Sequence, residues 1–291
     1  MKSNFFTEFI KNHPRKTLEF NGKTHTYIAG GHTKVGFIIL PGSGEDAYSS
    51  YNLIEYFEKK YRVLSIDYKG FHDLNEFLDF IKAVLVHEKV EKFVLYGFSI
   101  GGFFAQSYIR RNGMPFALIL SHTSLVKSKY IKWRLSFPLK ITKHVVPLIP
   151  NKLFRKVFTF LVTGLQQPGH IQDKNYKKYA SPEIQWRAIE YKKRFEEPLF
   201  DKEYVESIYN LGIEAEKEEL SHKSINPINS KNILILKTDN DPLSHDEGYL
   251  GKYYPLATIK TFKDTSHLTV FIQIESVIKE IDVFLSGLGG K

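Results

Sequence analysis

Short runs of apolar residues alternate with amphipathic segments along much of the chain. The strand-like runs, most of them apolar, are residues 35–40, 61–67, 93–98, 116–121, 232–237 and 257–262. Helical spacing of apolar residues follows them at residues 50–57, 74–87, 103–109, 244–254 and 269–285. Such short apolar runs are typical of strands buried on both faces, and strands that alternate with helices form a mostly parallel sheet. The pattern therefore predicts an α/β fold with helices on both faces.

A different pattern precedes these runs. Residues 17–20 and 24–28 alternate between polar and apolar side chains, and Asn21 and Gly22 stand between them. An Asn-Gly pair between alternating segments favours a tight turn, because both residues tolerate the positive φ angles that such a turn requires. The sequence predicts a β-hairpin here.

The alternation of strands and helices stops between Leu125 and about residue 229. This stretch contains helical and aromatic segments, no convincing buried strand, and prolines at positions 138, 147, 150, 168, 182 and 198. Strand-like runs resume at residue 232, so the stretch is predicted to be a helical cap inserted between two strands. We expect residues 1–124 to form the first part of the core, residues 125–229 the cap, and residues 230–291 the second part of the core.

Length and composition are those of a globular protein. The 291 residues are 42 % hydrophobic and 25 % charged, which excludes a disordered chain and allows a full core. No apolar stretch approaches the ~20 residues of a membrane-spanning helix, and residues 1–11 lack the apolar run of a signal peptide. Because cysteine is absent, disulfides, thiolate ligands and a cysteine nucleophile are excluded. We expect an intracellular, cytoplasmic protein.

Positive charge is concentrated in the middle of the chain. The formal net charge is +9, and no acidic residue occurs between Glu91 and Asp173. Common nucleic-acid-binding motifs are absent, so we expect no nucleic-acid partner. Residues 127–156 carry lysines and arginines among aromatic and aliphatic residues. Two interpretations stay open: weak association with an anionic membrane surface, or an ordinary lid with its apolar side towards a pocket and its charges in water.

The candidate chemistry centres on residues 97–101, which read Gly-Phe-Ser-Ile-Gly. An apolar run precedes this Gly-x-Ser-x-Gly sequence and a helical pattern follows it, which indicates the strand, sharp turn and helix of a nucleophile elbow. Such a turn lifts the Ser99 hydroxyl above the end of the sheet, and glycines flank the serine because side chains would collide across the turn. A purely structural glycine turn is the alternative interpretation.

A serine nucleophile needs a base to accept its proton, usually histidine. His267 is the preferred base because it alone, among eleven histidines, lies in the loop after the last predicted strand. A surface histidine without function is the alternative. His122 also follows a strand, but it precedes the cap and fits the required chain order badly. His32 and His72 lie in loops that are expected near the active edge of the sheet, where they could line the pocket.

The histidine in turn needs a carboxylate that fixes its tautomer and stabilises the imidazolium. Two aspartates follow the strand-like run 232–237. Asp241 is favoured because Pro242 follows it and restricts it to extended conformations. Asp239 lies nearer the strand end and stays open as the alternative acid.

The oxyanion of a tetrahedral intermediate needs two backbone N–H donors. Ile100, directly after the nucleophile, is one candidate, and Ser43 in the glycine-rich loop of residues 41–44 is the other. A glycine-rich loop can instead bind phosphate, but the Walker A and dinucleotide-binding sequence patterns are both absent. We expect no cofactor and no metal.

Together these segments resemble the α/β-hydrolase superfamily over nearly the whole chain. The matching parts are Pro-Gly-Ser-Gly at 41–44, Ser-Ile-Asp-Tyr-Lys-Gly at 65–70, the elbow at 97–102, Asp-Pro-Leu at 241–243 and Ser-His at 266–267. The beginning of the loop at 40–42 and Leu-Ser-His-Thr at 120–123 look most like the maspardin-like branch. Many members have His-Gly where this chain has Pro41-Gly42, so that histidine does not stiffen the loop here.

The resemblance implies an eight-stranded sheet with one antiparallel edge, a lid over the carboxyl ends of the strands, and hydrolysis through an acyl-enzyme on Ser99. Cleavage of a carboxylic ester or thioester in a small acyl substrate is the leading interpretation. An epoxide hydrolase would need aspartate at position 99. A non-catalytic binding or scaffold protein on the same fold is the alternative, because one fold supports many functions.

Overall fold

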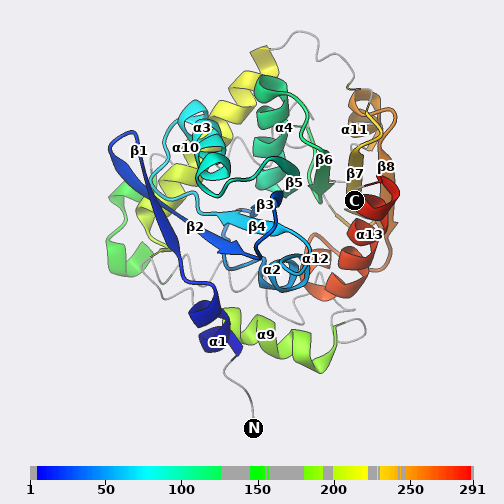
Figure 1. Ribbon diagram of the computed structural model, residues 1–291. Coiled ribbons are helices and arrows are strands. Elements are labelled where there is room, and N and C mark those ends of the chain that lie inside the picture. Colours follow the sequence, from blue (N-terminus) through cyan, green and yellow to red (C-terminus); the bar gives the residue numbers. More distant parts are fainter. Residues whose placement is uncertain are drawn as a thin grey trace.

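The computed structural model describes most of the chain outside the predicted cap. The described residues are 5–125, 145–154, 156, 180–192, 199–221, 228, 230–241, 243 and 247–289. Figure 1 shows a central sheet with helices on both of its faces. The α/β architecture predicted from the alternation of runs is confirmed.

Within the described residues, eight strands form one sheet in the order β1-β2-β4-β3-β5-β6-β7-β8. The strands are β1 (Lys16–Phe20), β2 (Lys23–Gly30), β3 (Val35–Leu40), β4 (Arg62–Ile66), β5 (Lys92–Phe98), β6 (Ala117–Ser121), β7 (Ile233–Thr238) and β8 (Thr258–Phe262). β2 pairs antiparallel with β1 and with β4, and the remaining pairs are parallel. The predicted hairpin is the β1–β2 pair, with Phe20 opposite Lys23.

Parallel pairing brings the carboxyl ends of the central strands to one edge of the sheet. β3 ends at Leu40, before the glycine-rich loop, and β5 ends at Phe98, directly before Ser99. β7 ends at Thr238 and β8 at Phe262. The loops that hold the predicted site residues therefore all leave the sheet at the same edge, which is where ligands bind in open α/β sheets.

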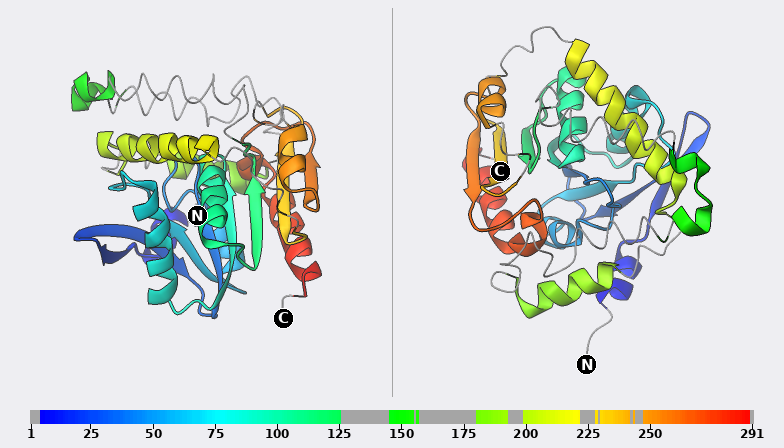
Figure 2. Two further views of the ribbon diagram at one scale, coloured as in Figure 1. Left: turned by 90° about the horizontal axis from the view of Figure 1, so that it is seen from above. Right: turned by 180° about the vertical axis from the view of Figure 1, so that it is seen from behind.

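Helices form the outer layers of the molecule. The described helices are α1 (Phe5–Asn12), α2 (Tyr51–Phe57), α3 (Leu74–His87), α4 (Ile100–Asn112), α9 (Pro182–Lys192), α10 (Lys202–Ser221), α11 (Glu247–Tyr253), α12 (Thr269–Ile272) and α13 (Ile274–Gly287), with a 3₁₀ turn η2 (Val146–Leu148). Helices α3 and α4 cover one face, α2 and α13 cover the other, and α10 crosses α3 and α4 (Figures 1 and 2). The core lies between these layers; for example, the ring of Phe57 in α2 stacks on that of Phe37 in β3 at 4.4 Å.

Two helical features differ from the sequence pattern. Helix α1 was not predicted, because a single short amphipathic segment carries little periodic signal; its buried Phe6 packs on Tyr51 of α2 and Tyr191 of α9. The single helix predicted over 269–285 is two helices, α12 and α13. They are separated at Gln273, whose φ of −111° and ψ of 38° leave the helical range.

The range 125–229 of the predicted cap is described only in part. Its described residues contain helices and no strand. Helix α9 contacts α1 and α12, and α10 contacts α3 and α4. The boundaries of the cap stay a prediction. In the described ranges, no helix has both the length and the apolar character needed to cross a membrane.

Candidate active site

Ser99 occupies the sharp turn between β5 and α4. Its backbone has φ 52° and ψ −117°, a conformation that a non-glycine residue adopts only when its surroundings enforce it. The end of β6 supplies that restraint. The Ser99 N–H donates to the Ser121 carbonyl at 3.0 Å, and the Thr123 hydroxyl donates to the Ser99 carbonyl at 2.7 Å. The strained geometry is that of a nucleophile elbow.

The glycines on either side of Ser99 are required by space. A Cβ atom on Gly97 would lie 2.5 Å from the Gly101 carbonyl oxygen. A Cβ atom on Gly101 would lie 2.1 Å from the Leu40 carbonyl oxygen at the end of β3. Both neighbours are backbone atoms that cannot rotate away. The close approach of helix α4 to the sheet thus explains the Gly-x-Ser-x-Gly spacing.

Three side chains from three loops form one hydrogen-bonded chain. Nε2 of His267 lies 3.0 Å from Oγ of Ser99, and Nδ1 of His267 lies 2.8 Å from Oδ2 of Asp241. The loops follow β5, β7 and β8. The Phe98 ring stacks on the imidazole with the two ring centres 5.2 Å apart. This packing fixes the plane of the imidazole between its two hydrogen-bond partners.

Asp241, rather than Asp239, contacts the imidazole. Asp241 is 1 % exposed, and its second oxygen accepts the Leu243 N–H at 2.9 Å. Asp239 is exposed to solvent. Burial would raise the pKa of Asp241, but the hydrogen bond from His267, the positive charge that His267 can hold and the Leu243 N–H outweigh it and lower the pKa. Asp241 is therefore an ionised carboxylate against the imidazole at neutral pH.

The two expected oxyanion donors come from two different segments of the chain. Ile100 is the first residue of α4, and Ser43 lies at an exposed position of the loop after β3. In the described part of the chain, neither backbone N–H donates to a protein acceptor. Gly42, one residue earlier, does: its N–H donates to Oε2 of Glu45 at 2.7 Å. The loop thus keeps the Ser43 donor available while it uses the neighbouring donor internally.

Several side chains stabilise the shape of this loop through hydrogen bonds. The Tyr68 hydroxyl donates to the Pro41 carbonyl, and the Tyr204 hydroxyl of α10 donates to the Glu45 carbonyl, both at 2.7 Å. Arg15 donates to the buried Asp46 carboxylate at 2.7 Å. The loop is therefore held at both of its ends by the core and by a helix of the predicted cap.

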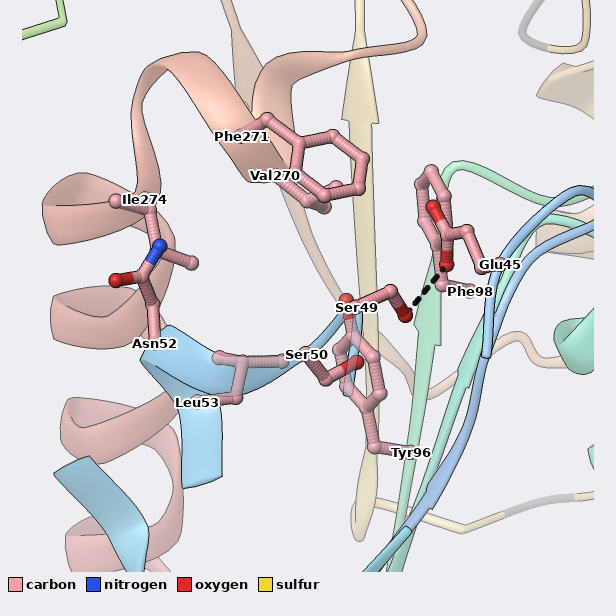
Figure 3. A pocket seen from close by; sticks show the side chains of 10 residues that line it. All are labelled: Glu45, Ser49, Ser50, Asn52, Leu53, Tyr96, Phe98, Val270, Phe271 and Ile274. Carbon is pink, nitrogen blue, oxygen red and sulfur yellow. Dashed lines mark hydrogen bonds between the residues drawn. The ribbon is translucent and has the colours of Figure 1, made fainter. Parts of the chain in front are cut away.

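A small cavity of about 20 Å³ lies behind the loop (Figure 3). Its wall is formed by Glu45, Ser49, Ser50, Asn52, Leu53, Tyr96, Phe98, Val270, Phe271 and Ile274. The cavity is too small for an acyl group, because ligand pockets usually measure several hundred Å³. The Glu45 carboxyl forms part of the wall of this small cavity.

The other histidines that the sequence singled out take different places. His122 is buried beside the site, with its ring centre 6.2 Å from that of His267, and burial lowers its pKa to about 3. It therefore stays neutral. His72 is exposed and contacts Asn210 of α10. The expectation that His32 could line the pocket is wrong: it precedes β3, and β3 runs towards the site, so His32 lies at the opposite edge of the sheet.

Glu45 is the residue near the site that the sequence did not reveal. It carries no motif of its own, and its side chain reaches back three residues to a backbone N–H, a contact that no periodic pattern reports. The one available signal was its position directly after a glycine-rich loop. Among the described residues, no group of three or more His, Asp or Glu side chains could hold a metal ion.

Fold and site geometry together define the class of structure. The order of the eight strands, the single antiparallel strand β2 and the serine elbow after β5 are those of the α/β-hydrolase fold. Solved structures with this fold cover nearly the whole chain. The chain has the α/β-hydrolase fold.

Three solved structures illustrate the similarity. The epoxide hydrolase CorEH without ligand is 14 % identical, with a TM-score of 0.69 over 95 % of this chain and 99 % of that chain. MenH from S. aureus is 18 % identical, with a TM-score of 0.65 over 95 % and 99 %. A carboxylesterase of the thaumarchaeon Nitrososphaera gargenis is 13 % identical, with a TM-score of 0.64 over 94 % and 99 %. No family model matches the chain, and no curated protein matches it. The maspardin-like branch stays a prediction.

Proposed function

We propose that the protein is a serine hydrolase that cleaves a carboxylic ester or thioester through an acyl-enzyme on Ser99. The observation that carries the proposal is the continuous chain of hydrogen bonds from Asp241 through His267 to Ser99 at a strained elbow. A serine hydroxyl is a weak nucleophile unless an oriented base takes its proton, and this arrangement supplies both the base and the group that orients it.

The proposed reaction has two halves. In the first, Oγ of Ser99 attacks the acyl carbon while Nε2 of His267 takes the hydroxyl proton, and Asp241 stabilises the imidazolium. His267 then returns the proton to the departing alcohol or thiol, which leaves the acyl group on Ser99. In the second half, His267 takes a proton from water, the hydroxide adds to the acyl carbon, and Ser99 leaves with that proton.

Negative charge develops on the carbonyl oxygen in both halves. The N–H groups of Ser43 and Ile100 are proposed to donate hydrogen bonds to this oxygen, since neither N–H has a protein acceptor among the described residues. Removing one such donor typically reduces kcat by about 10²–10³. The geometry of this loop is therefore as important to the proposal as the triad itself.

The similar structures include both epoxide hydrolases and a carboxylesterase. Position 99 favours ester chemistry for this chain, because a serine attached to an epoxide carbon would form a stable ether rather than an ester that water can cleave. The alternative of a non-catalytic binding protein explains the fold equally well, but it gives no reason for a buried, ionised Asp241 against His267.

Labelling with a fluorophosphonate probe tests the proposal. The folded wild-type protein should be labelled, and Ser99→Ala should abolish the labelling. Ser50→Ala is the matched control, because Ser50 lies near the same loop but makes no side-chain cap bond. Heat-denatured wild-type protein should not react. Absence of labelling on the folded wild type would support a binding protein. If the protein is labelled, a series of p-nitrophenyl esters and acyl thioesters of increasing chain length would separate ester from thioester cleavage.

A further inference from the structure

Glu45 is a buried carboxyl group that the proposed chemistry does not use. Its residue is 3 % exposed, and within the described ranges no lysine, arginine or histidine forms an ion pair with it. Burying an acidic group without a cation is costly, so such a group is retained only where its hydrogen bonds have a purpose. Oε2 of the Glu45 carboxyl accepts the Gly42 N–H at 2.7 Å. It also accepts the Ser49 hydroxyl at 3.3 Å (Figure 3).

The hydrogen bond from the Gly42 N–H to Glu45 restrains the most flexible part of the loop, residues 42–44. Ser43 stands between Gly42 and Gly44, and glycine permits a wide range of φ and ψ. The Ser43 N–H belongs to the peptide group that directly follows Gly42. Its direction therefore depends on how the Gly42 backbone is held.

Packing also restrains Gly42. A Cβ atom on Gly42 would lie 2.8 Å from Cδ1 of Phe98 and 3.2 Å from the carboxyl carbon of Glu45. The Phe98 ring and the Glu45 carboxyl thus both pack against Gly42 and leave no room for a side chain there. The Tyr68 hydroxyl holds the Pro41 carbonyl, and Tyr204 holds the Glu45 carbonyl and contacts the Gly44 backbone, whereas the Gly42 N–H is bound by Glu45.

We propose that Glu45 is a positioning residue of the oxyanion hole, whose carboxyl group binds the Gly42 N–H and thereby aims the Ser43 N–H at the reacting carbonyl oxygen. This inference rests on the proposed serine-hydrolase function. Glu45 touches neither substrate nor Ser99 in this role; it acts through the backbone of the loop.

The charge state of Glu45 gives the role a measurable signature. Burial raises the pKa of Glu45 to about 7, although the Gly42 N–H and the nearby His267 imidazole both act to lower it. The titratable groups around it are Asp46 in the same loop, His267, Tyr68, Tyr96 and Tyr204. A carboxylate accepts the Gly42 N–H more strongly than a neutral acid does. The pH dependence of kcat should therefore include the ionisation of Glu45 near neutral pH.

Two substitutions at position 45 separate positioning from folding. Glu45→Gln keeps an oxygen that can accept the Gly42 N–H, and Glu45→Ala removes it. We expect Glu45→Ala to lower kcat by about ten- to a hundredfold with KM within about twofold, as for partial loss of an oxyanion donor. Glu45→Gln should keep kcat within about threefold of wild type, and the ionisation that belongs to Glu45 should disappear from its kcat profile.

Asp46→Asn is the matched control, because Asp46 is an equally buried carboxylate in the same loop. Asp46 contacts Arg15, the Tyr48 N–H and Tyr191, so its loss should lower Tm while the ionisation of Glu45 stays in the kcat profile. Folded Glu45→Ala with wild-type kcat would overturn the inference, as would Glu45→Gln with an unchanged pH profile. The second result decides the matter even if Glu45→Ala does not fold. A wild-type protein without turnover would instead reject the proposed function.

Discussion

Nε2 of His267 lies 3.0 Å from Oγ of Ser99, although 168 positions separate the two residues in the chain. The sheet brings them together. Ser99 follows β5 and His267 follows β8, and because both strands run in the same direction their following loops meet at one edge. The intervening strands β6 and β7 contribute the two remaining contacts: the end of β6 holds the Ser99 backbone, and the loop after β7 carries Asp241.

The identity of the acid can be tested with two neighbouring aspartates. Asp241→Asn should lower kcat/KM by about 10³–10⁴, because an amide can hold the imidazole in the wrong tautomer and cannot stabilise its positive charge. Asp239→Asn is the matched control; Asp239 is exposed, and its loss should change kcat/KM by no more than about twofold. Steady-state kinetics on an ester substrate measures both. A severe loss in Asp239→Asn with a mild one in Asp241→Asn would assign the acid to Asp239.

Much of this site could be predicted because each of its parts leaves a local trace in the sequence. A buried strand appears as an apolar run, and the elbow needs glycines whose spacing is set by backbone contacts that Gly97 and Gly101 make. The chain order of Ser99, Asp241 and His267 follows from the order of the strands. The apolar runs and the Gly-x-Ser-x-Gly pattern are each visible in a short segment of the sequence, even though Gly101 contacts Leu40 on another strand.

Contacts between distant segments left no such trace. Arg15 donates to Asp46 and to Asp67, at 2.7 Å and 2.9 Å, across more than thirty positions in each case. Tyr204 reaches the Glu45 carbonyl from a helix of the predicted cap. Single charged or aromatic residues of this kind are compatible with many environments, so only the folded structure shows that they brace the loop after β3.

The spatial role of the elbow glycines is testable with a matched pair. Gly101→Ala would place a Cβ atom 2.1 Å from the Leu40 carbonyl oxygen, so helix α4 would have to move away from the sheet. We expect the free energy of unfolding to fall by at least about 2–3 kcal/mol. Gly251→Ala, in helix α11 with no atom within 4 Å of the new Cβ, should be neutral or stabilising by up to about 1 kcal/mol. Urea denaturation followed by circular dichroism measures both, and equal effects of the two substitutions would contradict the close approach of α4.

Glu88 should make stability depend on acid pH. Burial alone would raise the pKa of Glu88, but hydrogen bonds from Lys16, Tyr27 and Arg62 outweigh it and lower the pKa to about 2. A carboxylate with a lowered pKa stabilises the folded state above its unfolded-state pKa of about 4.5, and this contribution is lost as the pH falls towards 2. The shift corresponds to a contribution on the order of 3 kcal/mol at neutral pH.

Glu88→Gln should therefore lower the free energy of unfolding at pH 7 by about 2–3 kcal/mol, and the difference from wild type should shrink steadily below pH 4.5. Glu91→Gln is the control, since Glu91 pairs with Lys34 where both side chains are largely exposed, and its loss should leave stability unchanged. Chemical denaturation at a series of pH values measures the difference. A destabilisation by Glu88→Gln that stays constant down to pH 2 would mean that packing, not charge, is responsible.

Vesicle binding can decide between the two interpretations of residues 127–156, weak association with an anionic membrane surface or an ordinary lid with its charges in water. The described part of this stretch, residues 145–154 and 156, presents Leu148 with 82 % exposure and Leu153 with 52 %, beside the exposed Lys152 and Lys156. The other basic residues of the stretch, Lys127, Lys129, Lys132, Arg134, Lys140, Lys143 and Arg155, lie outside the described residues. Exposed aliphatic side chains next to lysines suit a surface of acidic headgroups, where each basic residue contributes about 1 kcal/mol.

The protein should co-sediment with vesicles that contain acidic lipid, should be released as the salt concentration rises, and should not bind neutral vesicles. Leu148→Glu should weaken the binding, because it replaces an apolar contact by a charge that acidic lipid repels. Val86→Glu is the matched control: Val86 is 78 % exposed, but it lies on α3 in the hydrolase core. If both variants lose vesicle binding equally, the loss reflects net charge alone. If the wild type binds neither kind of vesicle, the lysines belong to a lid whose charges face water.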